Sequence, residues 1–281
     1  MKKMKKMKKV FTSAPLPFMG QKRKFLKQFK PALNEFPADA IYVDMFGGSG
    51  LLSHTVKAYY SNATVIYNDF DGYSQRLANI DKTNALINDI RLILVNNPKD
   101  KIIKGEAREQ VLERIRLEET KGYVDYITLS SSILFSMNYA TCYNEIEKST
   151  LYNCVRQSNY NADGYLDGIE VVQIDYKELF KRYKDCNNVV FLVDPPYLST
   201  DASTYKGYWK LRDYLDVLNV LEGSNYFYFT SNKSQIVELC EWIESRSNLA
   251  NPFAGASMET MNTNVNHNAS YTDIMLYKLA G

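Results

Sequence analysis

An apolar strand that runs into a glycine-rich turn and then a helix is the feature that most limits the folds open to this chain. The strand covers residues 40–44, the turn is Phe46-Gly47-Gly48-Ser49-Gly50, and the helix begins near Leu51. Glycine lacks a Cβ and tolerates positive φ, so such a turn lets the backbone approach a ligand closely. It is neither the G-x-G-x-x-G of dinucleotide-binding folds nor a P-loop, because no Gly-Lys-Ser/Thr follows. The turn therefore indicates an α/β unit with a ligand site beside it.

Strand-like and helix-like segments alternate along most of the chain. Near-continuous apolar strands such as 188–193 suit the centre of a parallel sheet that is buried on both faces. The alternation predicts an α/β fold with helices covering a mostly parallel sheet. The final strand is expected to be an antiparallel partner at the end of the sheet. Further strands are expected at 64–67, 170–174, 226–230 and 271–278, and helices at 73–95, 101–121, 177–184, 214–221 and 235–245.

Length and composition are those of a folded protein, and the charge balance neither demands nor excludes a polyanionic partner. The 281 residues, 45% of them hydrophobic, suffice for one large domain or for a domain with a sizeable insertion. Residues 130–167 are polar and rich in Tyr and Asn, which is typical of an insertion. The net charge of +2 means that any DNA-binding surface must be local. The 22 tyrosines offer rings that can stack on bases, although most are expected to be ordinary core and surface residues.

Cysteine and histidine usage argues against a metal site or a disulfide framework. The four cysteines lack C-x-x-C spacing and the two histidines are far apart in the sequence. Reduced thiols, and the absence of an apolar run of about 18 residues, predict a cytoplasmic protein. The lysine-rich residues 1–14 are expected to form a disordered basic tail with weak attraction to phosphates.

An aspartate follows four of the expected strands. In open α/β sheets, ligands bind beyond the carboxyl ends of the strands, so these carboxylates are expected to converge on one edge. Asp69, after the second strand, is placed to bind the ribose hydroxyls of a nucleoside-bearing cofactor. The alternative is that Asp69 only caps the next helix. The four residues are Asp44, Asp69, Asp175 and Asp194.

The tetrad Asp194-Pro195-Pro196-Tyr197 carries the chemistry. Two prolines directly after a buried strand end it and fix the backbone. An aromatic amino group is a poor nucleophile because its lone pair is delocalised into the ring. If the Asp194 carboxylate and the Pro195 carbonyl accept its two hydrogens, the nitrogen can direct its lone pair at an electrophilic methyl group. Tyr197 could stack on the extruded ring.

These motifs, in this order, resemble the Dam-type (D12 class) DNA adenine-N6 methyltransferases. The first motif appears as Phe18-Met19-Gly20-Gln21-Lys22, with Gln21 in place of a glycine, and the second as Phe46 to Gly50, preceded by Asp44 where glutamate is more usual. The resemblance covers about residues 15–278. It implies a Rossmann-like methyltransferase sheet and S-adenosylmethionine as the cofactor. By resemblance, the cofactor-binding residues are Phe18, Gly20, Lys22, Asp44, Phe46, Gly48, Gly50, Asp69, Asp175, Tyr176 and Asp194, and the catalytic residues are Asp194, Pro195, Pro196 and Tyr197.

The resemblance also implies a division of labour along the chain. Residues 15–79 and 168–281 would form the catalytic domain, and residues 80–167 would form an inserted, largely helical target-recognition region. The expected partner is double-stranded DNA, and the protein is expected to be a monomer or a weak dimer. Candidate DNA contacts are Asn153, Arg156, Tyr160 and Lys206, with a phosphate contact or a surface ion pair as the alternative for Arg156.

Other activities remain open on the sequence alone. Cytosine-C5 methylation is excluded, because it needs a Pro-Cys nucleophile and none of the cysteines follows a proline. Cytosine-N4 methylation more often has serine at the position of Asp194, and RNA adenine or protein glutamine methylation more often has asparagine there. A catalytically inactive protein that binds DNA or the cofactor is the alternative from another class. The DNA sequence recognised and an accompanying restriction enzyme are likewise left open.

Overall fold

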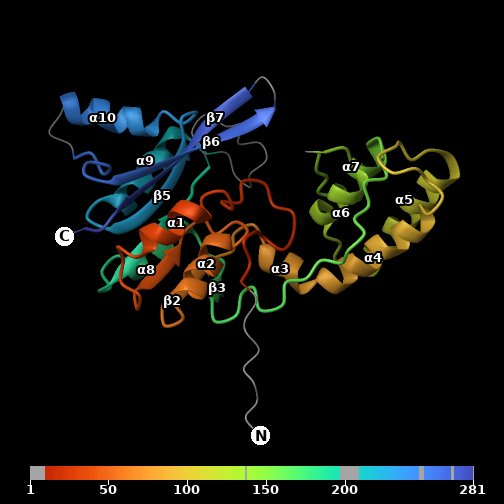
Figure 1. The fold of residues 1–281 in the computed structure, drawn as a ribbon, viewed down its shortest axis with the longest axis horizontal. Helices are drawn as coiled ribbons and strands as arrows, with labels where there is room; N and C mark the ends of the chain where they lie inside the picture. The colour runs from red at the N-terminus through yellow and green to blue at the C-terminus, as the bar shows by residue number, and fades with distance from the viewer. Residues whose placement is uncertain (1–9, 137, 197–208, 247–249, 267–268, 281) are drawn as a thin grey trace, which may run out of the picture. The chain divides into compact units, whose positions relative to one another are not determined.

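A seven-stranded mixed sheet forms the centre of the part of the chain that the structure describes (Figure 1). The computed structural model describes residues 10–136, 138–196, 209–246, 250–266 and 269–280, with the backbone alone for 263–266 and 269–270. The strand order is β3-β2-β1-β4-β5-β7-β6. All neighbours are parallel except β7, which runs antiparallel to β5 and to β6. The strands are β1 (Ile41–Asp44), β2 (Thr64–Asn68), β3 (Glu170–Val172), β4 (Val189–Val193), β5 (Asn225–Ser231), β6 (Ser257–Asn266) and β7 (Ala269–Lys278).

Alternate residues of the central strands face two helical layers. On one face, Phe227 and Phe229 of β5 contact phenylalanines of the N-terminal segment: Phe29 lies 4.9 Å from Phe227 and Phe25 lies 5.7 Å from Phe229, measured between ring centroids. This layer consists of α1 (Leu26–Leu33) and α2 (Leu51–Tyr59). Fully buried rings on a strand supply much of the apolar burial that holds such layers together.

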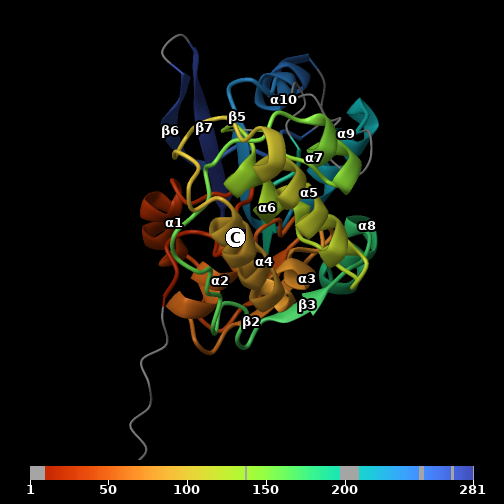
Figure 2. The same ribbon diagram turned by 90° about the vertical axis from the view of Figure 1, so that its right-hand side faces the viewer.

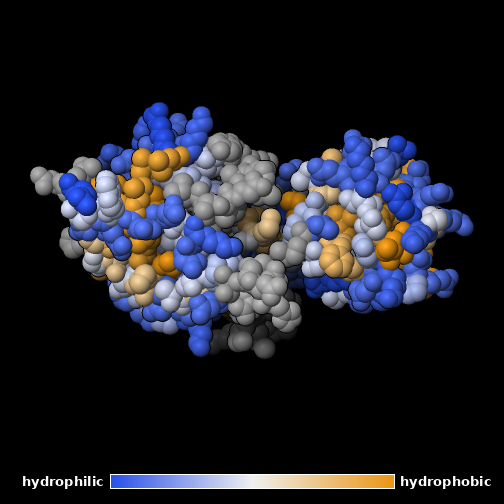
Figure 3. Space-filling view, turned by 90° about the horizontal axis from the view of Figure 1, so that it is seen from above, coloured by the Kyte–Doolittle hydropathy of each residue, from blue (hydrophilic) through white to orange (hydrophobic). Residues whose placement is uncertain are grey.

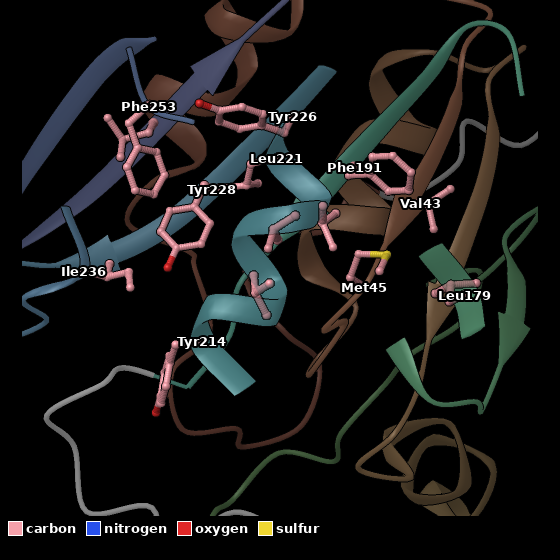
Figure 4. Packing of buried hydrophobic residues seen from close by; sticks show 14 of the residues in the cluster. Val43, Met45, Leu179, Phe191, Tyr214, Leu221, Tyr226, Tyr228, Ile236 and Phe253 are labelled. Atoms are coloured by element: carbon pink, nitrogen blue, oxygen red, sulfur yellow. The ribbon is translucent and has the colours of Figure 1, made fainter. Parts of the chain in front are cut away.

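On the opposite face, Tyr226 and Tyr228 of β5 join a second apolar cluster, in which Tyr214, Leu221 and Ile236 of the covering helices are buried (Figure 4). The two sets alternate along one strand because successive side chains of a strand point to opposite faces. Both faces of the sheet are therefore covered, as expected from the sequence. This layer consists of α8 (Tyr176–Tyr183), α9 (Leu211–Leu221) and α10 (Ile236–Arg246).

The chain divides into two compact units (Figures 1 and 2). The first holds the sheet and contains residues 20–71 and 165–281 with the N-terminal residues up to Ser13. The second contains residues 14–19 and 72–164 and is helical. Hydrophilic side chains cover much of the visible surface of each unit (Figure 3). The helices of the second unit are α3 (Tyr73–Ala78), α4 (Ile80–Ile93), α5 (Gly105–Glu119), α6 (Tyr126–Ile133) and α7 (Tyr143–Lys148).

A buried ion pair anchors the N-terminal segment of the second unit. Arg76 Nε lies 3.0 Å from Asp125 Oδ1, and its Nη2 donates to the carbonyl of Pro17 at 2.8 Å. The side chains of Arg76 and Asp125 are 5% and 1% exposed. The Tyr73 hydroxyl accepts from the Leu16 amide at 2.9 Å. Removing one partner of such a buried ion pair is strongly destabilising. The bonds of Arg76 to Pro17 and of Tyr73 to Leu16 attach residues 16–17 to helix α3.

The observed secondary structure differs from the expected one at several points. The helix expected over 73–95 is two helices, because it is interrupted at Asn79, where the backbone leaves the helical region at φ −104° and ψ 17°. Strand β6 was not predicted, since its polar sequence has no apolar alternation; it, and not β7, is the edge of the sheet. Helix α1 was missed as well. No helix among the described residues is long and apolar enough to cross a membrane.

Candidate active site

The register of the sheet brings three of the predicted aspartates to one edge. Asp44, the last residue of β1, is paired with Tyr67 of β2 and with Leu192 of β4. Asp69 and Asp194 each follow their paired residue by two positions, so both leave the sheet just beyond Asp44. Because the three strands are parallel, their carboxyl ends share this edge, which is where open α/β sheets bind ligands.

Asp44 is a buried carboxylate with one unsatisfied oxygen. Its side chain is 1% exposed, and Oδ2 accepts a 2.6 Å hydrogen bond from the Ser53 hydroxyl of α2. Oδ1 has no hydrogen-bond partner among the described residues. Burial, opposed by the Ser53 hydrogen bond and assisted by the charge of Asp194, raises the pKa of Asp44 to about 7. A buried carboxylate oxygen without a donor is costly, which suggests that a cationic or hydrogen-bonding ligand group completes it.

The glycine-rich turn is shaped by the ring of Tyr67. A Cβ at Gly47 would lie 2.1 Å from Tyr67 Cδ2, so no larger residue can stand there without a shift. Gly50 has a φ of +70° and directly precedes α2. The Tyr67 hydroxyl lies 2.7 Å from the carbonyl of Gly48 and 3.1 Å from Asp69 Oδ1. Tyr67 therefore links the turn to the second aspartate, and the requirement for glycine is strictest at Gly47, which the motif comparison had not singled out.

Asp69 is a buried carboxylate at the sheet edge. It is 2% exposed, and its Oδ1 lies 3.1 Å from the Tyr67 hydroxyl. The N-cap residue of α3 is Gly72, three positions further along the chain. Binding of ribose hydroxyls by Asp69 remains a prediction.

Asn68 joins three strand ends and was missed by sequence reasoning. Its Nδ2 donates to the carbonyls of Met45 and Ile174 at 3.1 and 3.0 Å, and its Oδ1 accepts from the Ile174 amide at 3.1 Å. The residue is 2% exposed. An asparagine can bridge two segments in this way because its amide carries both donors and acceptors. It holds the segments after β1 and β3 against the end of β2.

An aromatic cluster lies next to the turn. The ring centroid of Phe46 is 5.2 Å from that of Tyr176 and 5.6 Å from that of Trp209, and Tyr176 stacks on Trp209 at 5.8 Å with an interplanar angle of 22°. All three side chains are partly exposed. The sequence predicted Phe46 and Tyr176 but not Trp209, whose only signal was the aromatic character of the segment after the tetrad. Such a cluster offers flat apolar surface to a planar ligand.

Asp175 has a structural role at the start of α8. Its Oδ1 accepts from the Lys177 amide at 2.8 Å, and Asp175 is the N-cap of the helix. An exposed N-cap aspartate stabilises its helix by satisfying a free amide. Its predicted contact with the cofactor remains a prediction.

Asp194 is paired with a lysine from the first motif. Lys22 Nζ lies 2.5 Å from Asp194 Oδ2, and it also donates to the carbonyl of Gly20 at 3.1 Å. The side chains of Lys22 and Asp194 are 11% and 18% exposed. Burial raises the pKa of Asp194, the nearby Lys22 lowers it, and Asp273 raises it further. The sequence had predicted both residues, but not that they contact each other.

Four further predicted residues, Phe18, Asn153, Arg156 and Tyr160, lie in the second unit. The Phe18 ring packs edge-on against Tyr73 at 5.6 Å. Asn153 and Tyr160 are 4% and 7% exposed, and Asn153 donates to the carbonyl of Asn97 at 2.8 Å. Arg156 is exposed, with its guanidinium 4.3 Å from the centroid of the Tyr160 ring. Tyr197 and Lys206 lie outside the described residues.

Metal-binding side chains do not gather in the described part of the chain, where no group of three or more His, Cys, Asp or Glu residues could hold an ion. The free cysteines are Cys142, Cys154, Cys186 and Cys240.

Comparison with known proteins identifies the family of this chain. Residues 18–221 match the D12 class N6 adenine-specific DNA methyltransferase family. A protein of Haemophilus influenzae named "Putative methyltransferase" is 39% identical over 284 residues, an alignment that covers 96% of this chain and 94% of that protein. The matched region contains the glycine-rich turn, the sheet-edge aspartates and the Asp-Pro-Pro tripeptide. The chain belongs to the D12 class of N6 adenine-specific DNA methyltransferases.

Proposed function

We propose that this protein transfers the methyl group of S-adenosylmethionine to the N6 amino group of adenine in DNA, by direct in-line displacement on a base flipped out of the duplex. The observation that supports this most is the shared sheet edge, which places Asp194 next to the buried Asp44 and the glycine-rich turn. This arrangement supports the proposal that the catalytic carboxylate and the cofactor contacts of the sheet edge belong to one site. Family membership alone gives the reaction class.

The residues at the edge suit the parts of S-adenosylmethionine. Asp44 Oδ1, buried and without a donor, can accept from the ammonium of the methionine moiety. Asp69 is placed for the ribose hydroxyls, and the cluster of Phe46, Tyr176 and Trp209 offers a surface for the adenine ring. The turn at Gly47 lets the backbone pass close to the ligand.

Asp194 and Pro195 form the proposed amino-group clamp. The carboxylate accepts one hydrogen of the adenine amino group and the Pro195 carbonyl accepts the other, so the nitrogen lone pair points away from the clamp. The two prolines fix this carbonyl, because the φ of Pro195 is restricted by its ring and the ψ of Pro195 is restricted by the following Pro196. When bound, S-adenosylmethionine supplies an electrophilic methyl group on a sulfonium centre. Alignment of the nucleophile with this group accounts for much of the expected rate enhancement.

The second unit is the proposed target-recognition region. Arg156 is exposed, and two contacts fix its position. Its backbone carbonyl accepts from Arg91 Nη2 at 2.8 Å, and its guanidinium lies over the Tyr160 ring. An exposed arginine fixed in this way can contact either a guanine edge or a phosphate. Tyr160 and Asn153 support this segment from the interior.

Transfer of a labelled methyl group from S-adenosylmethionine to DNA tests the function. We expect the wild type to label adenine N6 in DNA, Asp194→Ala to keep the fold and lose most turnover, and Asp69→Ala mainly to weaken cofactor binding. Near-normal methylation by Asp194→Ala would refute the assigned role. Cofactor and DNA binding by the wild type without transfer would instead favour a protein that only binds, and label on cytosine or RNA would identify another substrate. Sequencing of modified bases in an expressing strain would give the recognition sequence.

A further inference from the structure

Lys22 is held against Asp194 from two directions. Its ammonium group lies 2.5 Å from Asp194 Oδ2 and donates to the carbonyl of Gly20 at 3.1 Å. The Lys22 carbonyl accepts from the Phe25 amide at 2.9 Å, which fixes the segment just before α1. Because the lysine side chain is only 11% exposed, little of the interaction is screened by water.

Among the residues that the structure describes, the other charged groups that act on Asp194 are acids. Asp273 of β7 raises the pKa of Asp194, and Asp44 of β1 and Asp194 repel each other. Tyr228 of β5 also faces Asp194, and burial keeps this phenol neutral by raising its pKa. Burial and these neighbours favour the protonated form of Asp194, whereas Lys22 favours the carboxylate.

We propose that Lys22 is a positioning residue for methyl transfer: it keeps Asp194 ionised and holds Oδ2, which leaves the other carboxylate oxygen to accept a hydrogen from the substrate amino group. This inference rests on the proposed function. It differs from the role that the family resemblance implied, in which Lys22 touches the cofactor.

The chemistry requires an acceptor at this position. A protonated Asp194 would present a hydroxyl to the amino group and lose an acceptor. In the transfer step, the amino nitrogen lone pair forms the new N–C bond while the C–S bond breaks and its electron pair stays on sulfur. The nitrogen then keeps both of its protons and carries a positive charge, and one of these protons passes to the Asp194 carboxylate and on to water. Lys22 thus has to keep the acceptor ionised before the step without making it a strong base.

A titration that needs no activity tests the electrostatic part. The carboxyl ¹³C signals of aspartate-labelled protein would be followed with pH, and the Asp194 signal assigned from its loss in Asp194→Asn. We expect Lys22→Met to raise the pKa of Asp194 by about one unit or more. Lys27→Met, which removes an exposed lysine of α1, is the matched control and should leave it unchanged. An unchanged Asp194 titration in folded Lys22→Met would overturn the proposal.

Kinetics test the catalytic part. For Lys22→Met we expect kcat to fall about tenfold or more near pH 7. The acidic limb of the plot of kcat against pH should move to higher pH. The Kd for S-adenosylmethionine should change less than about threefold. Lys22→Arg should restore part of kcat, because it retains the charge. Lost cofactor affinity with an unmoved pH profile would make Lys22 a cofactor contact and refute the proposal. The two proposals can fail separately. If Lys22→Met raises the pKa of Asp194 as expected but the wild type methylates no DNA, only the proposed function is refuted.

Discussion

The Ser53 hydroxyl donates a 2.6 Å hydrogen bond to Asp44 Oδ2, while Oδ1 of the same carboxylate has no hydrogen-bond partner among the described residues. One oxygen is therefore oriented by the first turns of α2 and the other is kept for a ligand. A hydrogen bond from a hydroxyl to a buried charged group contributes about 1.5–3 kcal/mol. In the proposed site, this arrangement makes the protonation state of Asp44 decisive for cofactor binding.

Cofactor affinity should increase as the pH rises through about 7. The pKa of Asp44 is raised to about 7 by burial, so the carboxyl is largely neutral at pH 6 and ionised at pH 7.5. Only the ionised form attracts the ammonium of S-adenosylmethionine. Calorimetric titrations between pH 5.5 and 7.5 should show the Kd increasing up to about tenfold for each pH unit below the pKa.

Two variants control this prediction. Asp44→Asn cannot ionise, so it should bind weakly with little dependence on pH. Ser53→Ala removes the hydrogen bond that lowers the pKa of Asp44, and should move the transition to higher pH. A pH-independent Kd in the wild type would contradict the assignment of Asp44 to the ammonium group.

Gly47→Ala should impair cofactor binding and stability together. The added Cβ would meet Tyr67 Cδ2 at 2.1 Å, and either the turn or the ring must move. Overpacking of this kind typically costs about 1–3 kcal/mol, and here it also displaces the cofactor-facing backbone. Urea unfolding and cofactor titration measure the two effects. Gly47 does not have a positive φ, so the loss should come from the clash and not from backbone strain. Gly105→Ala, whose added Cβ would meet nothing within 4 Å, is a control outside the turn and should leave cofactor binding unchanged. An equal loss of cofactor binding in both variants would contradict the steric explanation.

The strand ends were predictable from the sequence because local chemistry decides them. The buried strand before Asp194 is a continuous apolar run, and two prolines stop it, so its end could be placed from the residues alone. The same holds for Asp44, where the glycine-rich turn begins. Their convergence at one edge then follows from parallel pairing.

Contacts between distant segments were not predictable. Lys22 meets Asp194, and Asn68 bonds to Ile174, across 172 and 106 positions of the sequence, separations that no local pattern records. Strand β6 was missed for a related reason: its edge position allows polar residues such as Asn262 and Glu259, so the alternation that signals a half-buried strand is absent.

Trp209 should report cofactor binding. The chain has two tryptophans, and the other, Trp242, is 60% exposed on α10. In Trp242→Phe, fluorescence comes from Trp209, which stacks on Tyr176. We expect this fluorescence to change saturably as S-adenosylmethionine is added. Trp209→Ala should weaken binding several-fold, because about 1 kcal/mol of stacking is lost. The matched variant Trp209→Phe, which keeps an aromatic ring, should bind more tightly than Trp209→Ala. Unchanged fluorescence at saturating cofactor would place the adenine elsewhere.

The stability of the protein should fall as the pH drops below about 6.5, through His54. In the first unit, His54 Nε2 accepts from the Phe11 amide at 3.0 Å and Nδ1 donates to the Tyr165 carbonyl at 2.7 Å, so the ring is held in its neutral form. Burial lowers the pKa of His54 in the folded state, and Lys30 lowers it further. The unfolded chain, in which the pKa is about 6.5, then binds the proton more readily. Stability from this group is thus complete above that pH and is lost as the pH falls towards the lower, folded-state pKa.

Thermal unfolding at pH 5 and pH 7.5 measures the effect. His54→Asn is the comparison, because its amide can still donate to the Tyr165 carbonyl but does not titrate; it should be less stable at pH 7.5 and show a smaller loss between the two pH values. The Tyr165 hydroxyl also donates to the Ser49 carbonyl at 2.9 Å, so the histidine supports the residue that braces the glycine-rich turn. Loosening His54 should therefore weaken cofactor binding at acidic pH in addition to the effect of Asp44. An identical pH dependence of the melting temperature in the wild type and in His54→Asn would show that protonation of this ring does not control stability.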